Sequence, residues 1–184
     1  MKILMKLVCI LLLGGIFGCS LFNSGLSEGG KLCYGLIKKS GKRIGQKYGL
    51  SPSGIGAGGV YGLRLMILDF NRYGEPLTQK EARKLIILCA EEFLKDINSD
   101  EKLTSYLMDF PFSERNIDVS IFSYDNKGRD IYEPYIGVVS LSRGNIRYVT
   151  YILDQLNENS QFKETYEEAL EKLKQEEQTH NQNN

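Results

Sequence analysis

Residues 78–97, TQKEARKLIILCAEEFLKDI, decide the fold of this chain. Thr78 stands three residues before Glu81, the spacing of a capping box, in which each side chain bonds the other's backbone N–H at a helix start. The apolar residues that follow repeat at helical spacing and share one face: Ala82, Leu85, Ile86, Cys89, Phe93 and Ile97. We therefore predict a helix over 79–97, and its apolar face needs a sheet to pack against.

Four segments around this helix have the patterns of β-strands. Residues 60–70 are apolar at both odd and even positions, which is typical of a strand covered on both faces. Residues 117–124 alternate between apolar and polar side chains, and 135–141 and 146–153 follow after short turns. The sequence thus predicts an α+β domain with an antiparallel sheet of about four strands, in which 60–70 joins the later three-stranded meander.

Helices are expected at both ends of this sheet. Residues 31–48 have apolar side chains at helical spacing, although three glycines weaken the pattern. A short helix is expected from Ser99 or Asp100 to about residue 108. A C-terminal helix is indicated by Phe162, Tyr166, Leu170 and Leu173, and the last residues, 177–184, are expected to be disordered.

The segment 51–59, SPSGIGAGG, formally contains the G-x-G-x-x-G motif of dinucleotide-binding loops. Such a loop follows a strand and opens a helix, so that the helix N-terminus faces the pyrophosphate. Here a proline precedes the glycines and a predicted strand follows them. We therefore expect a linker or a hairpin-like lead-in without a nucleotide.

The first nineteen residues, MKILMKLVCILLLGGIFGC, have a basic start, an apolar run over 7–13 and small residues before Cys19. They resemble the signal of bacterial lipoproteins, with residues 16–19 as the lipobox. The resemblance implies cleavage before Cys19 and attachment of acyl chains, such as palmitate, to its sulfur and freed amine. The alternatives are a secretory signal cut elsewhere or an uncleaved anchor, but 3–17 is shorter than the roughly 20 residues that span a bilayer as a helix.

This resemblance sets the expected domain order and location. Residues 1–18 would be the signal peptide, 19–30 a flexible tether and 31–176 a single domain. The protein would be held at the membrane of the cell envelope by its N-terminal lipid. Ser20 stands where an aspartate retains many lipoproteins at the inner membrane, so the outer membrane is favoured if the envelope has two membranes.

Composition and residue types argue against several kinds of chemistry. The 23 basic and 23 acidic residues leave no net charge, so nucleic acid is not an expected partner. The lone histidine, His180, lies in the predicted tail, which excludes a Ser-His or Cys-His pair in the domain. Asp69 and Asp118 would form a carboxylate pair if their strands were neighbours. We expect no cofactor, no metal site and no catalytic residues.

Cys33 and Cys89 would remain in the mature domain after cleavage. An oxidising compartment allows a disulfide between them. The alternative is two buried thiols that pack as small apolar side chains, and we expect this second arrangement.

Five tyrosines lie in or beside the predicted meander: Tyr124, Tyr132, Tyr135, Tyr148 and Tyr151. They suit a partner surface because tyrosine combines a large rigid ring with a polar tip, but they also suit an ordinary half-covered sheet. The expected function is non-catalytic binding or scaffolding of an envelope protein or glycan. The alternatives are an envelope hydrolase that uses carboxylates and a surface-exposed factor that acts on a host or neighbouring cell.

Overall fold

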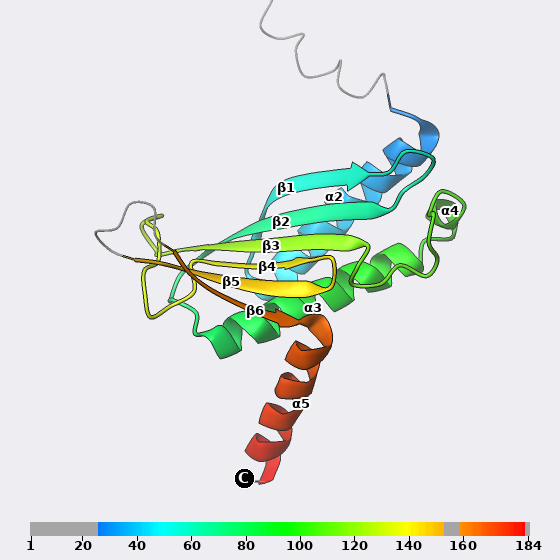
Figure 1. Ribbon diagram of the computed structural model, residues 1–184. Helices are drawn as coiled ribbons and strands as arrows, with labels where there is room; N and C mark the ends of the chain where they lie inside the picture. The colour runs from blue at the N-terminus through cyan, green and yellow to red at the C-terminus, as the bar shows by residue number, and fades with distance from the viewer. Residues whose placement is uncertain (1–25, 153–158, 183–184) are drawn as a thin grey trace, which may run out of the picture.

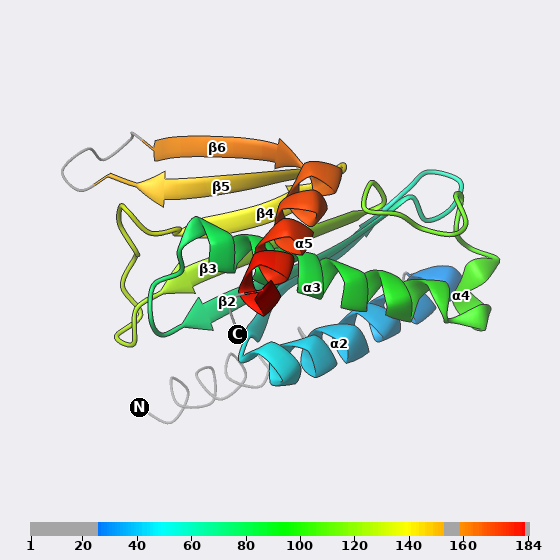
Figure 2. The same ribbon diagram turned by 90° about the horizontal axis from the view of Figure 1, so that it is seen from below.

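The computed structural model describes residues 26–152 and 159–182, which form an α+β domain with one mixed sheet. The helices α2 and α3 lie against one face of this sheet, and α5 leaves the sheet on the same side and packs on α3 (Figures 1 and 2). Among the described residues, no helix lies over the other face. The elements in chain order are α2 Glu28–Tyr48, β1 Ser51–Gly58, β2 Leu65–Tyr73, α3 Gln79–Asn98, α4 Glu101–Thr104, β3 Ile117–Tyr124, β4 Val138–Ser142, β5 Asn145–Tyr151, β6 Asn159–Thr165 and α5 Tyr166–Gln182.

The six strands follow one another across the sheet in chain order, from β1 to β6. All neighbours are antiparallel except β2 and β3, which are parallel. The sheet is therefore mixed and has six strands, whereas an antiparallel sheet of about four strands was predicted. The reason for the parallel pair is α3, which runs back along the sheet between β2 and β3, so that the chain enters β3 in the direction of β2.

Helix α3 confirms the prediction from its capping box. The N–H of Thr78 donates to Glu81 Oε2 at 2.8 Å, and the N–H of Glu81 donates to Thr78 Oγ1 at 3.3 Å. Its apolar face is buried against β3 and β4, which confirms the prediction that this face packs against a sheet.

Helix α2 begins at Glu28, so the last three residues of the predicted tether are helical. The hydroxyl of Ser27 caps it by accepting from the N–H of Gly30 at 3.2 Å. Two of its glycines allow close packing, because a Cβ at Gly41 would lie 3.0 Å from Leu68 and one at Gly45 would lie 2.6 Å from the carbonyl oxygen of Leu50. Two of the three glycines that weakened the sequence pattern thus lie where α2 packs closely on β2 and on the chain entering β1.

The predicted strand 60–70 is wrong in its first part. The glycine-rich segment, expected to be a linker or a hairpin-like lead-in, is the edge strand β1, which forms an antiparallel hairpin with β2 through residues 59–64. Proline has no N–H to donate. An edge strand tolerates Pro52 because its outer side has no neighbouring strand that would need this hydrogen bond. Glycine at position 54 leaves space for Asp69 of β2, whose Oδ2 would lie 2.6 Å from an added Cβ.

The C-terminal region also differs from the prediction. Phe162 lies in the edge strand β6, which pairs with β5, and α5 begins only at Tyr166. The helix continues to Gln182, so the backbone of 177–182 is helical where disorder was predicted. Strand β3 matches the predicted range, β4 and β5 are shifted by one to three residues at their ends, and α4 is shorter than predicted.

Candidate binding surfaces

Two tyrosines stand at the ends of the parallel strands, on the face of the sheet that none of the described helices covers. Tyr73 ends β2 and Tyr124 ends β3, and the two residues are register partners. Their rings are stacked with centroids 5.5 Å apart. Both residues have the strand parity of the half-exposed side chains, opposite to the buried core positions Met66, Leu68, Ile117 and Val119.

Three of the predicted tyrosines join them at this end. Tyr132 forms a bridge with Tyr151, and the N–H of Glu133 donates to the carbonyl oxygen of Tyr151 at 3.0 Å. The N–H of Tyr135 donates to the carbonyl oxygen of Tyr132 at 3.2 Å. Tyr73, Tyr132 and Tyr135 are 52%, 41% and 39% exposed. We name Tyr73, Tyr124, Tyr132, Tyr135 and Tyr151 the tyrosine cluster.

One member of the tyrosine cluster, Tyr151, has a shifted pKa. The pKa of Tyr151 is raised above its ordinary value by burial and, to a smaller extent, by the charge of Asp130 and by Tyr124. Its hydroxyl therefore stays protonated at neutral pH. The cluster presents aromatic faces with hydroxyl tips that donate and accept hydrogen bonds.

Tyr148 does not belong to this surface, so its predicted role there is wrong. It lies on the opposite face of β5, is 1% exposed and donates its hydroxyl to Glu164 Oε1 at 2.6 Å. Burial and the neighbouring carboxylate raise its pKa. Its parity within β5 matches that of the buried Ile146, whereas Tyr151 has the other parity.

A buried charged network lies beneath α5 and explains the position of Tyr148. Arg83 Nε of α3 donates to Glu164 Oε1 of β6 at 2.8 Å, and Lys172 Nζ of α5 donates to Glu164 Oε2 at 2.6 Å. Burial alone would raise the pKa of Glu164, but the hydrogen bonds from Arg83, Lys172 and Tyr148 outweigh it and lower the pKa below its ordinary value. The network fastens α5 and β6 to α3, and each oxygen of Glu164 has donors.

Asp69 and Asp118 lie on neighbouring strands of the uncovered face, as the carboxylate-pair hypothesis requires. Asp69 is the register partner of Ser120, and Asp118 is the partner of Ile67. Burial raises the pKa of Asp69, and the charge of Asp118 adds to this against a hydrogen bond from Ser120. Asp118 Oδ1 is buried without a hydrogen-bond partner among the described residues.

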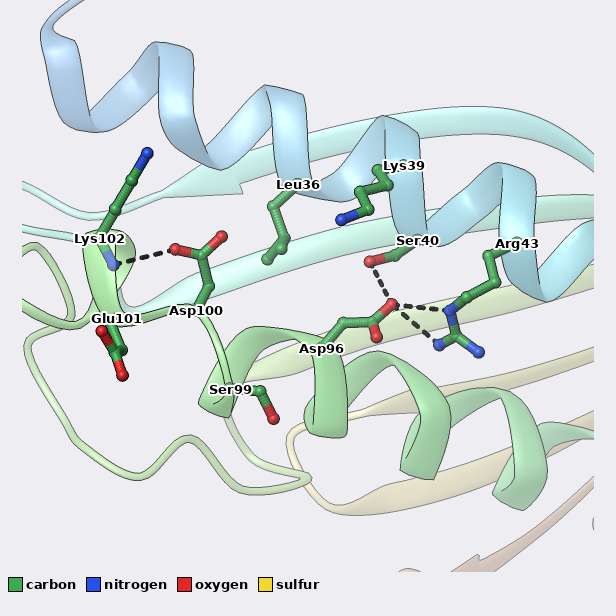
Figure 3. Close-up of a pocket in the computed structure, with 9 residues that line it drawn as sticks. All are labelled: Leu36, Lys39, Ser40, Arg43, Asp96, Ser99, Asp100, Glu101 and Lys102. Carbon is green, nitrogen blue, oxygen red and sulfur yellow. Dashed lines mark hydrogen bonds and ion pairs between the residues drawn. The ribbon is translucent and has the colours of Figure 1, made fainter.

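A cleft of about 540 Å³ separates α2 from the end of α3 and α4. Ser40 Oγ donates to Asp96 Oδ2 at 2.7 Å, and Arg43 Nη2 donates to the same oxygen at 2.8 Å (Figure 3). Arg43 also bonds Glu92, whose other oxygen accepts from Lys47 Nζ at 2.5 Å. Bonds from Lys47 and then Arg43 lower the pKa of Glu92.

The cleft has no preference for a charged ligand. Three basic side chains and three acidic side chains line it: Lys39, Arg43, Lys102, Asp96, Asp100 and Glu101. Asp100 is engaged as the cap of α4, where its Oδ1 accepts from the N–H of Lys102 at 3.0 Å. The ion pairs across the cleft therefore hold α2 against α3.

Cys33 and Cys89 are buried free thiols, which is the arrangement that we expected rather than a disulfide. Burial raises the pKa of Cys33 to about 11 and that of Cys89 to about 12. Because the thiolate is the reactive form, neither is a nucleophile at neutral pH.

No known protein family, curated protein or solved structure matches this chain. Within residues 26–152 and 159–182, no group of three His, Cys, Asp or Glu side chains is arranged to hold a metal ion. In the same part of the chain, no helix combines the length and apolar character needed to cross a bilayer. The predicted lipidation site, Cys19, lies outside the described residues.

Sequence reasoning missed Tyr73 as a member of the tyrosine cluster. The strand predicted over 60–70 ends three residues before Tyr73, so Tyr73 was in no predicted strand. The parallel pairing of β2 with β3 brings it beside Tyr124. Its neighbours along the chain carry no sign of that pairing, which depends on the path of α3.

Proposed function

We propose that this chain is a bacterial lipoprotein anchored through Cys19, whose domain binds an envelope protein or glycan without catalysing a reaction. The observation that carries the binding role is the tyrosine cluster, which gathers at one end of the sheet whose open face is covered by no helix within residues 26–152 and 159–182. The anchoring role is supported by the lipoprotein-like signal over residues 1–19.

The chemistry of the tyrosine cluster suits a binding surface. Tyrosine supplies a large contact area with few rotatable bonds, and its hydroxyl satisfies polar groups of a partner at the rim. The stacked pair of Tyr73 and Tyr124 limits the freedom of these rings before binding. Aromatic rings in such a patch often contribute most of the binding energy.

The binding role is tested by capture from detergent-solubilised membranes with the tagged full-length protein. We expect the double variant Tyr132→Ser/Tyr135→Ser to recover a specific protein or glycan at least about tenfold less well than the wild type, because each ring removed leaves a gap in the contact. Both side chains are part-exposed, so the fold should be retained.

Tyr61→Ser is the matched control in this detergent assay, because Tyr61 is 92% exposed in the turn between β1 and β2, at the other end of β2 from Tyr73. It should bind like the wild type. Equal capture by the wild type and by Tyr132→Ser/Tyr135→Ser would contradict a binding role for the tyrosine cluster, and recovery of nothing specific by any form would contradict scaffolding.

The anchoring role is tested by labelling cells with a palmitate analogue. The wild type should take up label and fractionate with membranes, whereas Cys19→Ala should do neither, since the acylated sulfur is absent. Cys33→Ala is a control that removes a buried thiol and should keep the label. Equal labelling of the wild type and Cys19→Ala would refute acylation at that residue.

A carboxylate-dependent hydrolase is the second candidate, and it is favoured by the neighbouring positions of Asp69 and Asp118. A carboxyl with a raised pKa beside a second carboxylate is a general acid-base arrangement. Both residues are partly buried on one face of the sheet, and neither the cleft beside α2 nor the pocket at the start of α2 includes them. For this reason we rank it below binding.

A further inference from the structure

We infer that the end of the domain where α2 begins docks on the bilayer through an apolar tip, formed by Val60, Tyr61, Met108 and Phe110. This inference rests on the proposed anchoring through Cys19 and adds an orientation to it. The tyrosine cluster and the apolar tip lie at opposite ends of the strands (Figure 1).

The side chains of the apolar tip are exposed to an unusual extent. Val60 and Tyr61, in the turn between β1 and β2, are 88% and 92% exposed. Met108 and Phe110, in the segment after α4, are 40% and 54% exposed. A group of large apolar side chains directed into solvent indicates a contact that the domain alone does not provide.

The two loops that carry the apolar tip are joined to each other. The N–H of Leu63 donates to the carbonyl oxygen of Tyr106 at 2.8 Å, and the N–H of Met108 donates to the carbonyl oxygen of Leu63 at 2.9 Å. Met108 also packs against Gly62, where an added Cβ would lie 2.8 Å from its sulfur. These bonds hold the turn and the segment after α4 as one surface.

The proposed anchor enters the domain beside this surface. Leu26, Ser27 and Gly29 at the start of α2 line a pocket of about 490 Å³ together with Val60 and Tyr61. Leu26 stands seven positions after Cys19, a length that spans at most about 25 Å when fully extended. The acyl chains therefore hold the apolar tip within reach of the bilayer.

The chemistry of the apolar tip fits the interface between headgroups and acyl chains. Tyrosine prefers this depth because its ring is apolar and its hydroxyl is polar, and valine, methionine and phenylalanine gain by leaving water. The exposed charges beside the tip are balanced, with Lys31 and Arg64 against Glu28 and Asp109. Docking should therefore depend on apolar insertion and proceed on vesicles without anionic lipid.

Tryptophan fluorescence provides the test, because the chain contains no tryptophan. The full acylated lipoprotein carrying Tyr61→Trp is reconstituted into phosphatidylcholine vesicles with or without bromine atoms on the acyl chains. We expect the tryptophan to emit at a shorter wavelength than a tryptophan exposed to water on the domain surface. We also expect its emission to lose intensity in the brominated vesicles. Tyr132→Trp, at the tyrosine cluster, is the matched control and should show neither effect.

Phe110→Trp is a second probe of the apolar tip and should behave like Tyr61→Trp, which keeps the test valid if one substitution disturbs the turn.

Acylation of the same samples is measured by mass. Acylated protein in which Tyr61→Trp and Phe110→Trp both escape quenching overturns docking and leaves the anchor intact. Equal quenching at Tyr61→Trp and Tyr132→Trp overturns the proposed orientation. Absence of the acyl chains overturns the proposed anchor, and docking with it.

Discussion

Replacement of Glu164 by leucine is expected to lower the free energy of unfolding by about 3–5 kcal/mol. The Glu164 side chain is 1% exposed and accepts hydrogen bonds from Arg83, Tyr148 and Lys172. Leucine would leave the guanidinium of Arg83, itself 8% exposed, with Glu176 as its remaining ion-pair partner in the described network. Such a loss is a large part of the total stability of a domain of this size.

Urea unfolding of three variants separates this effect from a general loss of charge. Glu167→Leu removes an exposed carboxylate from the same region and should change the free energy of unfolding by less than about 0.5 kcal/mol. The double variant Arg83→Met/Glu164→Leu should recover most of the loss, because an apolar pair removes the unpaired buried charge. A Glu164→Leu variant as stable as the wild type would show that the network does not hold α5.

The same network makes stability depend on pH. The pKa of Glu164 is lower in the folded protein than its ordinary value of 4.5. The unfolded chain therefore takes up the proton first as the pH falls, so the contribution of Glu164 is complete above pH 4.5 and is lost below it. The wild type should lose stability more steeply than Arg83→Met/Glu164→Leu over that acidic range.

Gly45→Ala is the second substitution with a large expected effect, a destabilisation of about 1–3 kcal/mol. The added Cβ would lie 2.6 Å from the carbonyl oxygen of Leu50 and 3.3 Å from Pro52 Cδ, so α2 and β1 would have to move apart. The backbone at position 50 cannot turn aside as a flexible side chain does.

Gly35→Ala is the matched control on the same helix. An added Cβ there meets nothing within 4 Å, so the variant should gain about 0.5–1 kcal/mol from helix propensity alone. Thermal or urea unfolding of both variants measures the difference. Stabilisation of both by the same amount would show that α2 does not depend on its close approach to β1.

The sequence predicts elements best where short-range chemistry and burial agree. The capping box of Thr78 and Glu81 and the apolar face behind it define α3 without tertiary information. Strand β3 is equally clear, because its core and surface positions alternate without exception. In both elements the same residues that favour the local structure also fill the core.

Prediction fails where contacts between distant residues decide the structure. Strand β1 has glycine at positions 54 and 56 where the side chains of Asp69 and Ile67 of β2 lie close, and that crowding is invisible along the chain. Strand β6 buries Glu164 in place of an apolar residue, which only Arg83, Tyr148 and Lys172 make favourable. Its pattern therefore lacks the usual alternation.

Two errors had a signal in the sequence. Thr165 and Glu168 have capping-box spacing, and the structure has both bonds, Thr165 N–H to Glu168 Oε2 at 2.8 Å and Glu168 N–H to Thr165 Oγ1 at 3.1 Å. This signal places the start of α5 after Phe162. Similarly, Tyr148 shares its strand parity with Ile146, so alternation alone would have assigned it to the core and left Tyr151 on the surface.

Strands β2 and β3 act as a spacer of fixed length. Both begin at the apolar tip and finish at the tyrosine cluster, and the nine residues of β2 extend over about 25 Å. A partner held by the tyrosine cluster would stand at a set height above a docked membrane, determined by the rigid sheet. Lengthening the chain between Cys19 and α2 would leave that height unchanged, whereas removing the apolar tip would let it vary with the length of the tether.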